Sequence, residues 1–131
     1  MAVQDEVILR LHSGIPVVEI GGEWSVKLVD MVTSMLTSLQ HAGHFEIVLN
    51  IQRAALGSMA GLRSLGGIAQ AFRSHHGHLD IVGTIEQIEE LSGEGLAGPF
   101  RLASSVESAL SRIKGTRVLA GGPRYTARTL D

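Results

Sequence analysis

The sequence predicts an α/β fold in one domain, a mixed and mostly parallel sheet with an opening β-hairpin and about four helices packed on it. The first observation is a pair of short runs rich in β-branched residues, residues 7–11 and 15–20, which only His12, Ser13 and Gly14 separate. The second is the alternation, after this hairpin, of apolar runs of strand length with segments of helical periodicity. Parallel neighbouring strands need helical crossovers, so this alternation indicates a sheet that is parallel beyond the hairpin.

Four apolar runs and one short extended piece are predicted to be strands. Pro16 cannot donate to a strand ladder, so we expect it at the start or the edge of the second strand. The run at residues 45–51 lies between Gly43 and Gly57 and is largely apolar, which is typical of a strand buried on both faces. In chain order the predicted strands are residues 7–11, 15–20, 45–51, 79–82 and 100–102.

Four helices are predicted from apolar residues at spacings of three and four. Ser25 is a candidate N-cap for the first helix, and Ile85 of the third is expected to point inward. Ser104 and Glu107 have the spacing of a capping box at the start of the last helix. In chain order the predicted helices are residues 26–40, 60–75, 85–91 and 104–114.

Composition limits what this chain can do. Apolar residues make up 44% of its 131 residues and aromatic residues 4%, so the core must be aliphatic. A formal charge of -2 argues against nucleic-acid binding, which needs a basic surface, and the absence of cysteine excludes disulfides and zinc–thiolate sites. The N-terminus is acidic where a signal peptide is basic, and no apolar run reaches membrane-spanning length, so we expect a cytoplasmic protein without direct membrane insertion.

The domain is expected to span residues 1–114. Residues 115–131 contain two adjacent glycines, a proline and three arginines without an apolar period, which predicts a flexible C-terminal tail.

Two turns that precede predicted helices carry a more specific signal. Residues 20–25 read Ile-Gly-Gly-Glu-Trp-Ser directly before the first helix, and residues 58–62 read Ser-Met-Ala-Gly-Leu at the start of the second. With the strand at residues 79–83 and the order of elements, they resemble the STAS domain family, which includes bacterial anti-sigma factor antagonists. The resemblance covers roughly residues 6–113. It implies a STAS-type protein-interaction module in signal transduction and transcription regulation, and not an enzyme.

In that family the corresponding segments dock on an anti-sigma factor or a kinase-like ATPase, and the serine after the motif aspartate accepts a phosphate. In this chain Met59 stands at the phosphoacceptor position, Ser58 replaces the aspartate and Ala60 replaces the second hydroxyl residue. A thioether cannot be phosphorylated, so the usual switch is not expected at Met59. The residues that the resemblance implies in partner binding are Gly22, Glu23, Trp24, Ser25, Ser58, Met59, Ala60, Gly61 and Leu62.

Several alternatives remain open. Ser58 is either the N-cap of the second helix or a phosphoacceptor shifted by one residue, and otherwise the loop binds its partner constitutively. Trp24 either packs over the sheet edge or forms an exposed aromatic anchor. Instead of a regulator in partner switching, the chain could be a non-phosphorylated structural subunit of a signalling scaffold or a membrane-transport complex. A small-ligand sensor ranks last, and the sequence leaves open whether the chain forms a homodimer.

Two further patterns are interpreted as structural. Residues 93–98 match GxGxxG but follow a predicted helix and run into Pro99, whereas a dinucleotide site needs the motif between a strand and a helix. Five of the six histidines cluster near helix ends, where imidazole complements the helix dipole, and no cysteine accompanies them. We therefore expect no cofactor, no metal site and no catalytic residue. These histidines are His41, His44, His75, His76 and His78.

Overall fold

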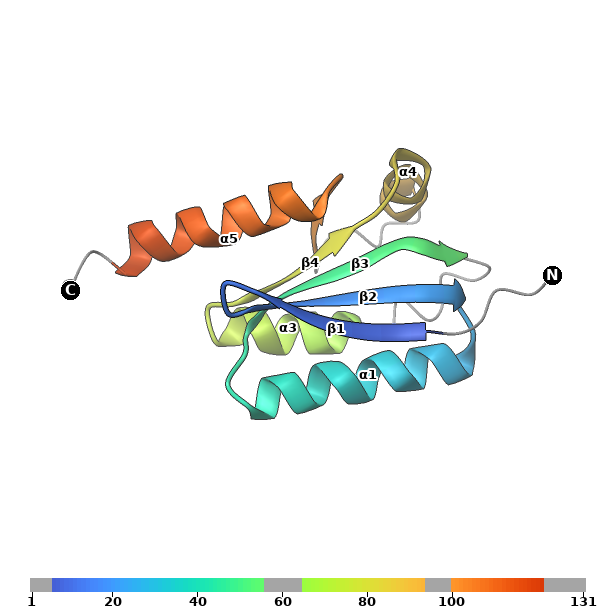
Figure 1. Ribbon diagram of the computed structural model, residues 1–131, viewed down its shortest axis with the longest axis horizontal. Coiled ribbons are helices and arrows are strands. Elements are labelled where there is room, and N and C mark those ends of the chain that lie inside the picture. Colours follow the sequence, from blue (N-terminus) through green and yellow to red (C-terminus); the bar gives the residue numbers. More distant parts are fainter. Residues whose placement is uncertain (1–5, 56–64, 94–99, 122–131) are drawn as a thin grey trace.

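A computed structural model of the chain describes residues 6–55, 65–93 and 100–121, the last six of them as backbone only (Figure 1). These residues form one five-stranded sheet in the order β1-β2-β3-β4-β5, with helices on both faces. The strands are β1 (Glu6–His12), β2 (Ile15–Glu23), β3 (Glu46–Ala55), β4 (His78–Val82) and β5 (Arg101–Ala103). The helices are α1 (Val26–His41), α3 (Gly66–Ser74), α4 (Ile85–Gly93) and α5 (Val106–Gly121).

The predicted mixed sheet is confirmed. Strands β1 and β2 pair antiparallel, and β2 to β5 are parallel to one another. The hairpin turns on Ser13 and Gly14, whose φ angles of 55° and 80° are both left-handed, as a two-residue type I′ turn requires. Pro16 is the second residue of β2, and the ladder to β3 begins only at Val17, so its missing N–H lies at the start of the strand as predicted.

The sheet separates two apolar clusters. Helices α1 and α3 cover one face and α5 covers the other (Figure 1). The α1 residues Leu28, Val32, Leu36 and Leu39 are buried at helical spacing in the larger cluster. The smaller cluster, under α5, consists of Ile15, Val17, Val48, Val82, Ala103, Ala109, Leu110 and Ile113. Residues 47–51 of β3 and 79–82 of β4 are buried between the helices of the two faces, which accounts for their largely apolar sequences.

A serine begins α1, as predicted, and glycines follow α1 and α3. The Ser25 hydroxyl accepts a hydrogen bond from the Leu28 N–H at 3.2 Å and caps α1. After α1, Gly43 has a φ of 93°, which favours glycine. After α3, a Cβ at Gly77 would overlap the Phe45 carbonyl oxygen, so only glycine allows the two backbones to approach there.

Two predictions about the last helix need correction. Helix α5, which was predicted to end at residue 114, continues to Gly121. Glycine at 115 costs a helix only about 1 kcal/mol, so it does not end α5. The cap of α5 is Ser105, whose hydroxyl accepts from the Ser108 N–H at 3.0 Å, and not Ser104 with Glu107. Residues 60–64, the predicted start of the second helix, and residues 122–131 lie outside the described residues.

Strands β2 and β3 also run three and four residues beyond their predicted ends at residues 20 and 51. The added residues pair with each other, Gly21 with Arg53 and Gly22 with Ala54, so the two strands extend together. Neither extension is apolar enough to be read locally as strand. It is this added pairing that shapes the candidate site.

Candidate partner-binding site

The candidate site lies where β2 and β3 end side by side, at the carboxyl edge of the sheet (Figure 1). Glu23 is the last residue of β2 and pairs with Ala55, the last residue of β3. One residue farther on, the Trp24 N–H donates to the Ala55 carbonyl oxygen at 2.9 Å. The turn into α1 is therefore fixed to the residue that precedes segment 56–64. In open parallel sheets this edge is the usual location of binding sites.

Glycine sets the backbone of this turn. The ladder between β2 and β3 shifts register between Glu19 and Gly21, and Gly22 follows with a φ of 108°. An L side chain rarely adopts that angle, and Gly22 is buried as well. The two features turn the chain sharply out of β2, so that Glu23 and Ser25 reach the surface.

The predicted partner-binding residues of this turn divide into exposed and supporting ones. Glu23 and Ser25 are exposed, although the Ser25 hydroxyl is already used as the α1 cap. Trp24 is only 4% exposed and belongs to the larger apolar cluster, so an exposed aromatic anchor is wrong. The indole points into the core because the Gly22 backbone and the hydrogen bond to Ala55 set the direction of the chain at Trp24. It supports the turn from beneath.

The other five predicted residues are not described by the structure. Ser58, Met59, Ala60, Gly61 and Leu62 lie within residues 56–64, outside the described residues. What the structure does show is that the strand leading into them ends against the turn at residues 22–25.

Two exposed apolar side chains at the same edge were not predicted. Val26, the first residue of α1, is 80% exposed, and Ile85, the first residue of α4, is 68% exposed. The prediction that Ile85 points inward is wrong, because the first turn of α4 instead directs Gln87 toward β3. For Val26 a signal existed, since it falls outside the apolar stripe that begins at Leu28.

Gln87 is a second residue that the sequence analysis missed. Its side-chain amide donates to the carbonyl oxygens of Ile51 and Ala54, at 2.9 and 3.0 Å. Its carbonyl oxygen accepts from the Thr84 N–H at 2.8 Å, and the Thr84 hydroxyl accepts in return from the Gln87 N–H at 3.2 Å. This reciprocal pair is a capping box, and the spacing Thr84-x-x-Gln87 was its sequence signal. Gln87 thus connects α4 to the carboxyl-terminal half of β3, next to the candidate site.

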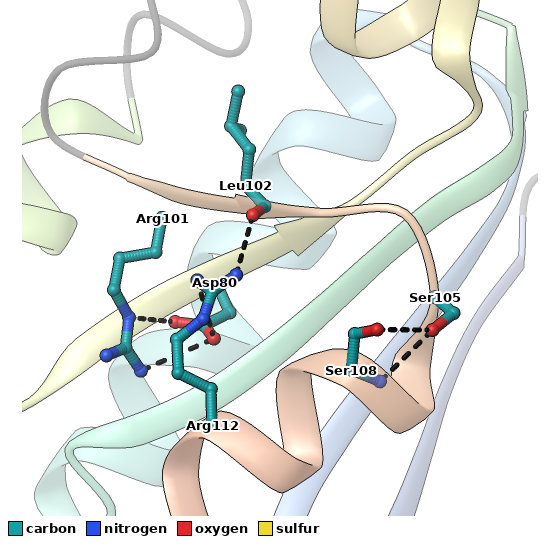
Figure 2. A network of polar contacts seen from close by, with 6 residues as sticks. All are labelled: Asp80, Arg101, Leu102, Ser105, Ser108 and Arg112. Carbon is teal, nitrogen blue, oxygen red and sulfur yellow. Dashed lines mark hydrogen bonds and ion pairs between the residues drawn. The ribbon is translucent and has the colours of Figure 1, made fainter. Parts of the chain in front are cut away.

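A charged cluster on the face of the sheet that α5 covers stabilises the fold (Figure 2). Asp80 is fully buried and accepts from Arg101 Nε at 2.8 Å and Nη2 at 3.3 Å, while Arg112 Nη1 lies 3.7 Å away. Arg112 also donates to the Leu102 carbonyl oxygen at 2.9 Å. Burial raises the pKa of Asp80 above its ordinary value, and the Arg101 hydrogen bonds oppose that rise. The cluster joins β4, β5 and α5.

The histidines lie at the other end of the sheet. His44, His75 and His76 line a hollow of about 230 Å³ with Phe45, Glu46 and the adjacent glycines. The His75 ring stacks on Phe45 with centroids 4.2 Å apart. Among the described residues, no group of three or more histidine or carboxylate side chains is arranged to hold a metal ion. Burial lowers the pKa of His78.

The GxGxxG segment begins at the end of a helix. Gly93 is the last residue of α4, so the motif begins where a helix ends, and its remaining residues lie outside the described part of the chain. Within the described ranges, no helix combines the length and the apolar character needed to cross a membrane.

Two solved structures share the fold of this chain. An anti-sigma factor antagonist from Mycobacterium paratuberculosis matches with a TM-score of 0.74 at 16% sequence identity, over 85% of this chain and 95% of that chain. The anti-sigma factor antagonist SpoIIAA in its unphosphorylated form matches with a TM-score of 0.66 at 16% identity, over 84% and 99%. No family model matches the chain, and no curated protein matches it at a significant level. The chain therefore has the STAS fold of anti-sigma factor antagonists, as its motifs predicted.

Proposed function

We propose that this chain is a cytoplasmic protein-binding regulator similar to anti-sigma factor antagonists, and that it acts by docking and not by catalysis. Its partner is an anti-sigma factor or a kinase-like ATPase. The docking surface consists of residues 22–26 together with residues 58–62. The observation that supports this surface best is the pairing of β2 and β3 to their last residues, with the Trp24 N–H bound to Ala55.

The described part of this surface suits protein recognition. Glu23 and Ser25 supply polar groups, and Val26 supplies an exposed apolar contact beside them. The turn that carries them is held by the Trp24–Ala55 hydrogen bond, by the buried Trp24 side chain and by the α1 cap, so little conformational entropy is lost when a partner binds. A partner that buries Val26 fully gains roughly 1.5 kcal/mol, which is about tenfold in affinity.

Regulation must differ from the usual phosphorylation at the position of Met59. Either the loop binds constitutively, or Ser58 accepts the phosphate one residue earlier. A phosphate would add a charge of about -1.5 to -2 to the docking surface and would repel an acidic partner. A second candidate function, a non-phosphorylated structural subunit of a signalling scaffold or a membrane-transport complex, is favoured by one observation, the methionine at position 59.

The test is affinity purification of the tagged chain from its own host, followed by mass spectrometry of the co-purifying proteins and of the peptide over residues 54–63. Recovery of an anti-sigma factor or a kinase-like ATPase supports the regulator, and a phosphate on Ser58 places the switch there. Scaffold or transporter subunits in fixed stoichiometry, with an unmodified peptide, refute it in favour of the structural subunit.

Two variants show whether the proposed surface is used. Val26→Asp places a charge on the surface without harming α1, whose first turn contains no acidic residue and accepts one favourably. Leu11→Asp is the matched control, since Leu11 is 63% exposed but lies at the hairpin, at the opposite end of the sheet. We expect Val26→Asp to reduce partner recovery about tenfold and Leu11→Asp to leave it unchanged. Equal recovery with both variants would exclude this surface.

A further inference from the structure

Strand β1 is an edge of the sheet that the described residues leave uncovered. It pairs with β2 on one side and is the first strand in the sheet order. Its seven residues contain no proline, and its ladder with β2 is regular from Glu6 to His12. Natural proteins usually protect such edges with proline, bulges, charged side chains or a covering segment, because unpaired backbone groups attract another strand. The charged residues of β1, Glu6 and Arg10, have opposite signs.

The hairpin determines which backbone groups face the open side. In a two-residue hairpin the closing pair, here His12 and Ile15, exchanges hydrogen bonds. Alternate residues back along β1, including Ile8, therefore direct their backbone groups to β2. Val7 and Leu9 direct their N–H and C=O groups to the open edge.

The side chains of β1 are complementary to a second copy of the same strand running antiparallel. With Ile8 opposite Ile8 of the second copy, Glu6 lies opposite Arg10 of that copy, and this pair occurs twice by symmetry. Opposite charges placed in this way attract, whereas a parallel arrangement would align like charges. Within one copy, Glu6 lies 3.5 Å from Arg53 and Arg10 lies 4.0 Å from Glu19, so the added pairs extend an existing alternation of charge.

The apolar face of β1 favours the same register. A groove of about 550 Å³ lies between β1 and α1 and is lined by Val7, Asp30, Met31, Ser34, Met35 and Ser38. Val7 and Leu9 lie on this face, and Leu9 is 40% exposed. In the antiparallel register, Leu9 of the second copy lies opposite Val7, beside the groove. Each copy thus offers an exposed leucine to the groove of the other.

We propose that the chain forms a symmetric homodimer through antiparallel pairing of β1 with β1 of a second copy, which joins the two sheets into one. Val7 and Leu9 would exchange backbone hydrogen bonds across the axis, twice by symmetry. The dimer does not depend on the proposed function, since it uses the edge strand and not the turn at residues 22–26.

Charge exchange tests the register. Glu6→Arg and Arg10→Glu each place like charges opposite one another at both symmetric pairs, while the double variant E6R/R10E restores opposite charges with the order inverted. By sedimentation equilibrium we expect the wild type to dimerise, each single variant to dissociate at least about tenfold more readily, and the double variant to return to within about threefold of the wild type. A wild type that stays monomeric, single variants without effect, or a double variant no better than the singles would each overturn the proposal. Circular dichroism melts confirm that all the variants fold.

Cysteine placement provides a second, independent readout because the chain has no cysteine of its own. Ile8 on the two-fold axis forms a non-hydrogen-bonded pair, whose Cα atoms lie about 4.5 Å apart, within disulfide range. Leu9 and Leu9 of the second copy are diagonal neighbours about 7–8 Å apart and cannot be bridged without movement. Under mild oxidation Ile8→Cys is expected to form disulfide-linked dimers much faster than Leu9→Cys. Equal rates, or no dimer with Ile8→Cys, would contradict the register.

Discussion

Replacing Gln87 by alanine is expected to destabilise the folded state, because the Gln87 side chain connects α4 to the end of β3. The side-chain amide makes three hydrogen bonds, to the carbonyl oxygens of Ile51 and Ala54 and from the N–H of Thr84, all between 2.8 and 3.0 Å. Alanine removes all three, and it leaves two carbonyl groups without the donor that joins β3 to α4.

The size of the effect follows from the number of bonds lost. A net hydrogen bond contributes about 1 kcal/mol, and Gln87 is only half-buried, so water can replace part of what is lost. The free energy of unfolding should therefore fall by about 2–3 kcal/mol. For a domain of this length, that corresponds to a decrease in Tm of roughly 10 °C.

Thermal and urea unfolding, followed by circular dichroism, measure the effect. Glu89→Ala is the matched control, because Glu89 is exposed on the same helix and its removal should change stability by less than about 0.5 kcal/mol. Gln87→Glu separates the two functions of the amide, since a carboxylate keeps the acceptor for Thr84 but faces two carbonyl oxygens. The two carbonyl oxygens should raise the pKa of the introduced carboxyl group, because they disfavour its charged form. This variant should therefore gain stability as the pH falls through that pKa. If Gln87→Ala and Glu89→Ala have the same Tm, the interpretation that the Gln87 side chain stabilises the end of β3 is wrong.

Three further predictions concern other parts of the molecule. Asp80→Asn should lower the free energy of unfolding in urea by about 1–3 kcal/mol, because it removes the anion that pairs with Arg101 and Arg112. The loss is limited because both guanidinium groups are partly exposed and the cost of burying the carboxylate is relieved; a stability equal to that of the wild type would contradict this. The lowered pKa of His78 means that the folded state binds its proton less readily than the unfolded state, so stability should fall as the pH decreases below 6.5. His78→Gln should flatten that slope in urea titrations between about pH 7 and 5, and an unchanged slope would exclude His78 as its source. Gly22→Ala should cost roughly 1–3 kcal/mol in thermal melts, because alanine is strained at a φ of 108°, whereas Gly67→Ala, in helix α3 with open space around it, should be neutral or stabilising.

Local patterns were sufficient for much of the fold. The turn residues predicted the hairpin, short apolar runs predicted the strands, and apolar spacings of three and four predicted the helices. Ser25 was predicted as a cap because a hydroxyl reaches an N–H three residues away without help from the rest of the chain. The order of these elements, with the two turn motifs, was enough to predict the STAS fold that the solved structures share. Apart from the order of the elements, each of these signals depends on residues that lie close together in sequence.

The features that shape the candidate site depend on residues far apart in sequence. The last residues of β2 and β3 become strand only because they pair with each other, and neither segment carries that information alone. Trp24 is buried because the turn that precedes it is bound to Ala55, 31 positions along the chain. Gln87 lies 36 residues from one of its carbonyl partners and 33 from the other. Side-chain reach and strand pairing act through space, so the sequence determined the elements and their order, while only the tertiary structure decided which side chains reach the surface of the site.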